Sequence, residues 1–217
     1  MKFKLAVKHS IDFVISLVLL ILLSPLFLIV ALIIKLESRG PVFFKQDRIG
    51  KDGELFVIYK FRSMVNNADK MGAGINLSKD DNRITPFGHF IRNWSIDELP
   101  QLINILIGDM SIIGPRPTIT YQVERYSERQ RKRLNMRPGV TGWAQVNGRN
   151  SLPWVKRIEY DIWYVENYSL LLDLKIFIKT FRVALLREGL YGEDGVNDDF
   201  DVTTIEPENE KEQRETV

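Results

Sequence analysis

An uncharged apolar run constrains this chain of 217 residues more than any other feature of its sequence. Residues 13–34 read FVISLVLLILLSPLFLIVALII, and 19 of these 22 residues are hydrophobic. A transmembrane helix needs about 20 apolar residues, so the run is long enough to form one. A cleaved signal peptide has a shorter apolar region that ends in small residues. Here the run passes directly into Lys35-Leu36-Glu37-Ser38-Arg39, so we expect the segment to remain on the protein as a membrane helix.

Ser24-Pro25 interrupts the middle of this run. An interior proline removes a helix hydrogen bond and kinks the helix, and the Ser24 hydroxyl is placed to satisfy a carbonyl freed by the kink. The arms on either side hold about 11 and 9 residues, or roughly 17 and 14 Å at 1.5 Å per residue. Neither arm alone crosses about 30 Å of hydrocarbon.

Positive charge flanks the run on both sides, whereas a spanning helix concentrates it on one side. The flanking basic residues are Lys2, Lys4 and Lys8 before the run and Lys35, Arg39, Lys45, Arg48 and Lys51 after it. This pattern favours a re-entrant helix that enters and leaves through the cytoplasmic face of the membrane. A simple kinked span is the alternative.

The remaining charge is unevenly distributed along the chain. Residues 192–217 contain ten acids and two bases, whereas residues 1–191 carry a net charge of +10. A segment so acidic and so poor in aromatic residues is typically disordered. We therefore divide the chain into a re-entrant membrane helix at 1–40, a cytosol-facing domain at 41–191 and an acidic disordered tail at 192–217.

The domain at 41–191 is predicted to be α+β and mainly helical. Residues 41–64 read as a small β-hairpin around Gly50-Lys51-Asp52-Gly53. The period of two in its second strand places Lys60 and Arg62 on one face, which suits either an anionic ligand or solvent. The strongly charged stretch 124–136 is predicted to be a surface helix.

Residues 169–188 form an amphipathic pattern in which Lys175, Lys179 and Arg182 make one basic stripe between apolar residues. Such a helix either lies in the plane of the lipid headgroups or packs on the core with its basic face in solvent. We predict an interfacial helix and keep the core-packed helix as the alternative.

The inventory of reactive side chains is narrow. With no cysteine and only His9 and His89, the chain has neither disulfides nor a thiolate or multi-histidine metal site. It also lacks the GxSxG, P-loop and GxGxxG spacings. Chemistry therefore has to come from carboxylates, basic residues, hydroxyls or an oxygen-bound metal ion.

The adjacent carboxylates Asp97 and Glu98 are the leading candidates. One interpretation is structural, because Ser95-Ile96-Asp97-Glu98 matches a capping box, or Asp97 itself caps a helix that carries Pro100 in its first turn. The other is catalytic, because a helix start attracts phosphate and adjacent helical side chains point about 100° apart. One carboxylate then faces a phosphorus atom while its neighbour binds Mg²⁺. The cations available to neutralise charge in phosphoryl transfer are Arg92, Arg116, Lys60 and Arg62.

Several short motifs follow one another along residues 8–190. They are Ser24-Pro25, Tyr59-Lys60-Phe61-Arg62-Ser63-Met64, Arg92 with Asp97-Glu98-Leu99-Pro100-Gln101, Gly108-Asp109-Met110-Ser111, Gly114-Pro115-Arg116-Pro117, Arg137-Pro138-Gly139 with Gly142-Trp143, Asp161 with Tyr164, and Asp173-Leu174-Lys175. In this order they resemble the bacterial sugar transferase family, and within it the small monotopic phosphoglycosyl transferases that act on polyprenyl phosphate. Any one motif arises readily by chance, but their joint order is specific.

The resemblance implies a catalytic domain at 41–191 and a covalent mechanism. Asp97 would attack the β-phosphate of a UDP-sugar and release UMP, and undecaprenyl phosphate would then accept the sugar phosphate in the first membrane step of glycan or polysaccharide synthesis. Glu98 would bind Mg²⁺ and Arg92 would engage phosphate. We assign anion contact to Lys60, Arg62, Arg116 and Arg137 as well.

The resemblance also implies where the protein works and with what. We expect a monotopic protein on the cytoplasmic face of the bacterial inner membrane, with inner-membrane lipid, UDP-sugar and undecaprenyl phosphate as partners and no nucleic acid. A homodimer stays open. The alternative function is a non-catalytic membrane-anchored adaptor in which Asp97-Glu98 only caps a helix.

Overall fold

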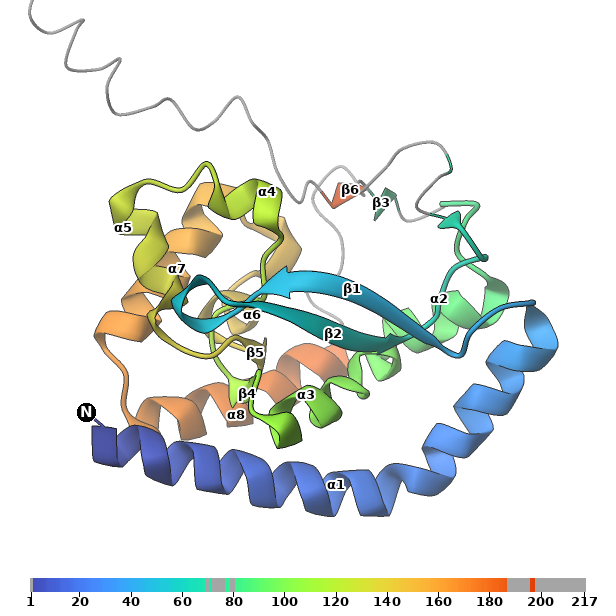
Figure 1. Ribbon diagram of the computed structural model, residues 1–217, viewed down its shortest axis with the longest axis horizontal. Coiled ribbons are helices and arrows are strands. Elements are labelled where there is room, and N and C mark those ends of the chain that lie inside the picture. The colour runs from blue at the N-terminus through green and yellow to red at the C-terminus, as the bar shows by residue number, and fades with distance from the viewer. Residues whose placement is uncertain (1, 69–70, 72–76, 79–80, 187–195, 198–217) are drawn as a thin grey trace, which may run out of the picture.

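The computed structural model describes residues 2–68, 71, 77–78, 81–186 and 196–197, and Figure 1 shows their arrangement. A mixed body of short helices and small sheets lies on one long N-terminal helix. The helices are α1 (Lys2–Glu37), α2 (Pro86–Asn93), α3 (Gln101–Ile107), α4 (Thr120–Val123), α5 (Glu128–Arg131), α6 (Trp143–Val146), α7 (Trp154–Glu166) and α8 (Leu170–Leu186). The strands are β1 (Phe43–Ile49), β2 (Leu55–Phe61), β3 (Leu77–Ser78), β4 (Ser111–Ile113), β5 (Gly139–Thr141) and β6 (Val196–Asn197).

The apolar run lies within α1, which is bowed beneath the body (Figure 1). Pro25 lies inside this helix and has no N–H to donate to the carbonyl of Ile21. The hydroxyl of Ser24 donates to that carbonyl instead, at 2.8 Å. The expected role of Ser24 at the proline is therefore confirmed.

Most of α1 remains exposed, and by length and composition it could cross a membrane. Two stretches nevertheless contact the body. Near the C-terminal end, Val30 and Ile34 are buried in a cluster with Phe61 and Ile91. Near the N-terminal end, one face of the helix is buried and polar.

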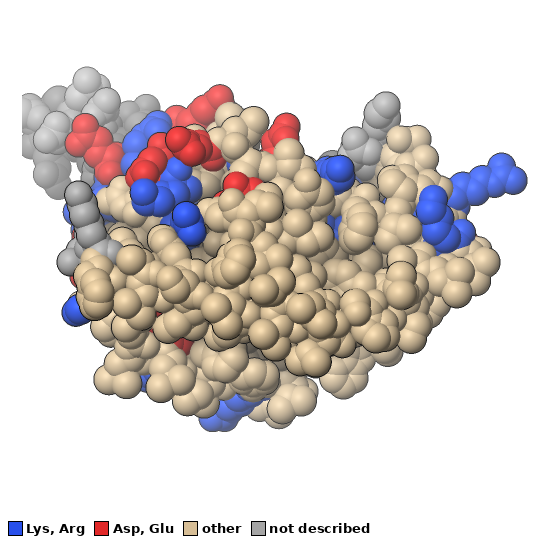
Figure 2. All heavy atoms as spheres, turned by 60° about the horizontal axis from the view of Figure 1, so that its bottom comes forward, with Lys and Arg blue, Asp and Glu red and all other residues tan. Residues whose placement is uncertain are grey.

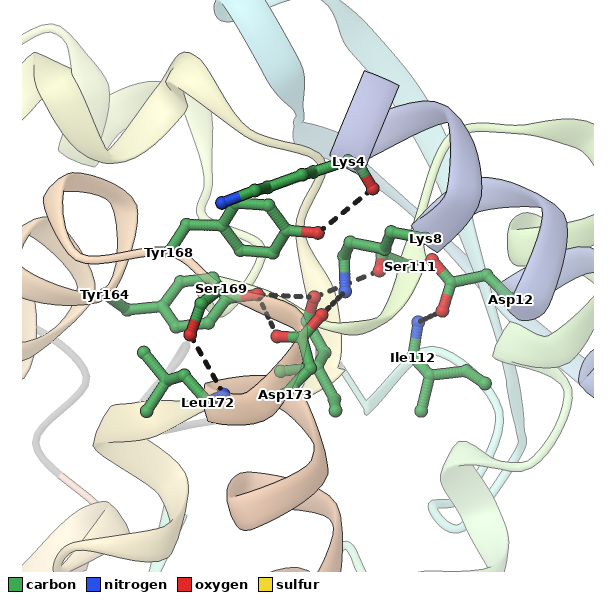
Figure 3. Close-up of polar contacts among 11 residues, drawn as sticks. Lys4, Lys8, Asp12, Ser111, Ile112, Tyr164, Tyr168, Ser169, Leu172 and Asp173 are labelled. Atoms are coloured by element: carbon green, nitrogen blue, oxygen red, sulfur yellow. Dashed lines mark hydrogen bonds and ion pairs between the residues drawn. The ribbon is translucent and has the colours of Figure 1, made fainter. Parts of the chain in front are cut away.

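Figure 3 shows this polar face of α1 meeting two other elements. The ammonium of Lys8 donates to Asp173 Oδ2 of α8 at 2.7 Å, and the hydroxyl of Tyr164 donates to Asp173 Oδ1 at 2.6 Å. One turn further along α1, Asp12 accepts from the hydroxyl of Ser111 at 2.6 Å. Together with the burial of Val30 and Ile34 near the other end of the helix, these bonds join both arms of α1 to the same body.

The hairpin is confirmed: β1 and β2 pair antiparallel, with Phe43 opposite Phe61 and Ile49 opposite Leu55. A second small sheet pairs β4 and β5 in parallel. There Gly114 and Gly139 lie so close that a Cβ on Gly139 would come within 2.1 Å of the Gly114 nitrogen. This contact fixes the loop that leads from β4 to Arg116.

The prediction of one surface helix at 124–136 is wrong. The segment folds as α5 followed by a 3₁₀ turn at Lys132–Asn135. The helix begins only at Glu128, because the hydroxyl of Ser127 caps it there by accepting from the N–H of Gln130. Arg133, in the 3₁₀ turn, faces inward. Its guanidinium is buried and forms an ion pair with Asp161.

The amphipathic pattern at 169–188 is realised as α8, in which Asp173 and Ile176 are buried. Large apolar side chains on its other side are exposed, among them Leu171, Ile178 and Phe181. The predicted acidic tail at 192–217 lies outside the described residues, apart from Val196–Asn197, which pair with Leu77–Ser78.

Candidate active site

Asp97 and Glu98 lie in a 3₁₀ turn, Ile96–Glu98, between α2 and α3. Neither capping interpretation holds. Ser95 adopts a left-handed conformation with φ of 54° and makes no side-chain cap. The helix α3 begins only after Pro100, because proline has no N–H for the interior of a helix. The turn thus presents two neighbouring carboxylates that are not needed as caps.

Asp97 is the more buried of the two carboxylates. Burial raises the pKa of Asp97 to about 6, and the adjacent charge of Glu98 raises it in the same direction. Lys60, Arg92 and Arg116 oppose this effect. A buried carboxylate with a raised pKa is more basic and less hydrated than one in water, and both properties suit a nucleophile.

Glu98 behaves in the opposite way. Burial acts to raise its pKa, but the positive charges of Lys60 and Arg116 outweigh burial and hold the pKa of Glu98 well below its usual range. The ammonium of Lys60 donates to Glu98 Oε1 at 2.7 Å, and Arg116 approaches the same oxygen at 3.5 Å. Two neighbouring acids in one turn are therefore given different basicities, a common arrangement in enzymes that use paired carboxylates.

The structure brings three of the predicted cations to this pair. Lys60 comes from β2 and Arg116 from the loop after β4, whereas Arg92 lies in the last turn of α2, five residues before Asp97. A small cavity of about 50 Å³ lies beside Glu98 and is lined also by Arg48 and Arg133. Four basic residues line this cavity, a composition that attracts anions.

Arg62 is not part of this group. Its guanidinium donates to the carbonyls of Ser38 and Arg39 just beyond α1, at 2.8 and 2.9 Å. Helix ends carry carbonyls without helical partners, which attract cations. Arg62 therefore fastens α1 to the hairpin, although the strand period places it on the same face as Lys60.

Arg137 also lies elsewhere. Its guanidinium sits about 3.5 Å from where a Cβ on Gly108 would be, at the end of α3, and its charge lowers the pKa of His9 on α1, after the larger effect of burial. In this structure Arg137 is a basic residue near α1, and no contact of Arg137 with Asp97 or Glu98 is found among the described residues.

Arg149 is a site residue that the sequence did not single out. Its guanidinium donates to the hydroxyl of Ser95 at 3.2 Å, and its charge lowers the pKa of Glu98. The backbone of Arg149 is left-handed, with φ of 53°, and follows Gly148 at φ of 138°. A non-glycine residue in this region is uncommon and is often found at functional sites. The only local signal was an arginine directly after a glycine in an irregular stretch.

The site therefore consists of a buried carboxylate pair among four cations, in a small helical domain joined to a long exposed apolar helix. Such a site suits the binding and transfer of phosphoryl groups at a membrane surface. Residues 3–187 match the bacterial sugar transferase family, so the chain belongs to that family of transferases.

The sequences of known proteins align with most of this chain. An uncharacterized sugar transferase of Bacillus subtilis, EpsL, is 45% identical over 84% of this chain and 89% of its own length. The undecaprenyl-phosphate galactose phosphotransferase of Salmonella typhimurium is 40% identical over 85% of this chain but only 41% of its own length. A UDP-glucose:undecaprenyl-phosphate glucose-1-phosphate transferase of Klebsiella pneumoniae is 41% identical over 83% of this chain and 40% of its own length.

Proposed function

We propose that this protein transfers a sugar 1-phosphate from a UDP-sugar to undecaprenyl phosphate through a covalent aspartyl-phosphosugar. The observation that carries the proposal is the buried pair of neighbouring carboxylates among four positively charged side chains. The pKa of Asp97 is raised and that of Glu98 is lowered. The names of the Salmonella and Klebsiella relatives support the two substrates.

In the first step a carboxylate oxygen of Asp97 attacks the β-phosphorus of the UDP-sugar. The bond from that phosphorus to the bridging oxygen breaks, and UMP leaves with the electron pair. In the second step a phosphate oxygen of undecaprenyl phosphate attacks the same phosphorus, and the carboxylate of Asp97 is released. Lys60, Arg92, Arg116 and Arg149 neutralise the phosphate charge in both steps, which is the main requirement of phosphoryl transfer.

The carboxylates of this site fit Mg²⁺ when phosphate oxygens of the substrate supply part of the coordination. Among the residues that the structure describes, no three acidic or histidine side chains gather to hold a metal ion. Mg²⁺ is, however, usually held by one or two carboxylates together with substrate phosphates. We assign the ion to Glu98, which would hold it together with phosphate oxygens of the substrate. Bound there, Mg²⁺ would neutralise charge on the diphosphate.

We infer that the protein is monotopic on the cytoplasmic face of the inner membrane, and two contacts of α1 support the monotopic placement. Lys8 near one end of α1 and Ile34 near the other are both buried against the same body. A helix that crosses the bilayer separates its ends by about 30 Å of hydrocarbon. A body of this polarity does not extend through that layer, so we infer that α1 dips into one leaflet and that α8 lies in the interface.

Cysteine labelling tests this topology. The chain has no native cysteine, so Lys4→Cys and Ser38→Cys each introduce a single thiol on one flank of the apolar run. We expect a membrane-impermeant maleimide to label both variants from the same side of sealed vesicles. Labelling from opposite sides would show that α1 spans the membrane.

The proposed reaction is tested by UMP release. The full chain in lipid nanodiscs is mixed with a panel of UDP-sugars and undecaprenyl phosphate. We expect Mg²⁺-dependent release of UMP with at least one sugar, and its loss on chelation. No release with any UDP-sugar, from protein that retains its fold, would favour the adaptor function.

Arg149→Gln tests the newly found site residue. A hydrogen bond to a charged group contributes about 1.5–3 kcal/mol, so we expect kcat/KM for the UDP-sugar to fall by roughly 10- to 100-fold. Arg131→Gln, on the exposed face of α5, is the matched control and is expected to leave kcat/KM unchanged. Equal effects of both substitutions would remove Arg149 from the site.

A further inference from the structure

A groove along α8 lies apart from the carboxylate site. It has a volume of about 570 Å³, and its walls include Trp163 of α7 and Leu171, Leu174 and Ile178 of α8. These three α8 side chains are more than half exposed. Exposed apolar side chains in a groove mark a binding surface for an apolar ligand.

Two lysines also line this groove. Lys175 and Lys179 are one helical turn apart, and their ammonium groups lie 5.7 and 5.1 Å from the centre of the Trp143 ring. Lys179 also donates to the side-chain oxygen of Asn147 at 3.2 Å. Trp143 stacks on Trp163 at 4.9 Å, so the aromatic pair holds both cations at the groove.

The acids nearest to this aromatic pair have other partners. Glu159 and Glu166 of α7 lie beside Trp143 and Trp163, but they form ion pairs with Arg129 and Lys132, at 2.7 and 3.1 Å. In the described part of the chain, neither groove lysine forms an ion pair. Two neighbouring positive charges beside an apolar groove are thus left for an external anion.

Further exposed apolar side chains surround the groove on α8, and another large apolar face lies elsewhere on the molecule. Figure 2 shows the face that carries α1 as a nearly continuous surface without charge, with Lys, Arg, Asp and Glu mostly around its margin. The helix α8 also exposes apolar side chains beyond the groove, among them Phe181 and Leu185. With α8 in the membrane interface, as inferred from the monotopic placement, this groove lies within reach of lipid.

We propose that this groove binds one bilayer phospholipid with a net negative headgroup. An acyl chain lies along Leu171, Leu174 and Ile178, and the phosphate lies beside Lys175 and Lys179. A zwitterionic headgroup suits the site less well, because its own ammonium group would meet the two lysines. The proposal rests on the membrane placement but not on the transferase chemistry.

Lipid retention measured by native mass spectrometry tests the proposal. The full chain is purified in neutral detergent with equal amounts of phosphatidylglycerol and phosphatidylcholine. We expect the wild type to retain one phosphatidylglycerol in preference to phosphatidylcholine. Lys175→Gln/Lys179→Gln should weaken this retention by about 30-fold, the effect of two basic residues on an anionic lipid.

Lys156→Gln/Arg182→Gln is the matched control, because it also removes two exposed positive charges from α7 and α8 but leaves the groove intact. It should retain the lipid as the wild type does. Equal retention of phosphatidylglycerol by the groove variant and the wild type would overturn the proposal. Displacement of the lipid by one equivalent of undecaprenyl phosphate would overturn it too, because the groove would then belong to the acceptor.

The same preparations are assayed for UMP release, so that the lipid groove and the transferase reaction are tested independently of each other. Loss of phosphatidylglycerol preference in an active variant supports the groove and leaves the reaction intact. Absence of UMP release from every preparation, with lipid preference unchanged, counts against the reaction and not against the groove.

Discussion

Asp97→Asn is expected to lower the rate of UMP release by at least about 10³-fold while the protein stays folded. Removal of a covalent nucleophile costs this much or more because no neighbouring group replaces the bond that it forms. The substitution is nearly isosteric. It also removes the repulsion between two buried neighbouring charges, which is the second cause of the raised pKa of Asp97. Stability should therefore be unchanged or slightly higher.

Three measurements on this variant separate its roles. UMP release is followed with the best UDP-sugar, covalent labelling is followed with a radiolabelled sugar in the absence of acceptor, and stability is followed by thermal unfolding in detergent. Asp47→Asn removes an exposed carboxylate from β1 and should retain activity and labelling. Substantial turnover by Asp97→Asn would exclude Asp97 as the nucleophile.

Local patterns predicted the parts of this fold that depend on neighbouring residues. The apolar run and Ser24-Pro25 specify α1 and its hydroxyl-to-carbonyl bond, since the proline and the freed carbonyl are four residues apart. The turn at residues 50–53 likewise specifies the hairpin. In both cases the physical cause lies within a few residues, so the pattern is sufficient.

The site was less predictable, because long-range contacts decide which cations reach it. The period of two predicts Lys60 and Arg62 on one strand face, yet Lys60 meets Glu98 whereas Arg62, one residue beyond β2, reaches the carbonyls beyond α1. Arg149 approaches Ser95 from 54 residues away. A strand period describes the direction of a side chain but not the element that it meets, so neither contact follows from spacing.

The buried ion pair of Lys8 and Asp173 joins residues 165 positions apart, and its loss is expected to lower stability strongly. The two side chains are only 4% and 11% exposed. Removing one partner leaves the other charge buried without compensation, which costs about 3–5 kcal/mol. We expect Lys8→Met or Asp173→Asn to lower the free energy of unfolding by that amount, measured by denaturant titration in detergent.

The double variant Lys8→Met/Asp173→Asn removes both charges and keeps an acceptor for the hydroxyl of Tyr164. Its loss should be well below the sum of the two single losses, because the cost lies in the uncompensated charge rather than in the pair itself. Lys51→Met is the matched control. The Lys51–Asp52 pair has the same 2.7 Å separation, but its side chains are 45% and 60% exposed, so its loss should cost less than about 1 kcal/mol. Additive losses in the double variant would show that Lys8 and Asp173 stabilise the fold independently, and that their ion pair does not hold α1 against α8.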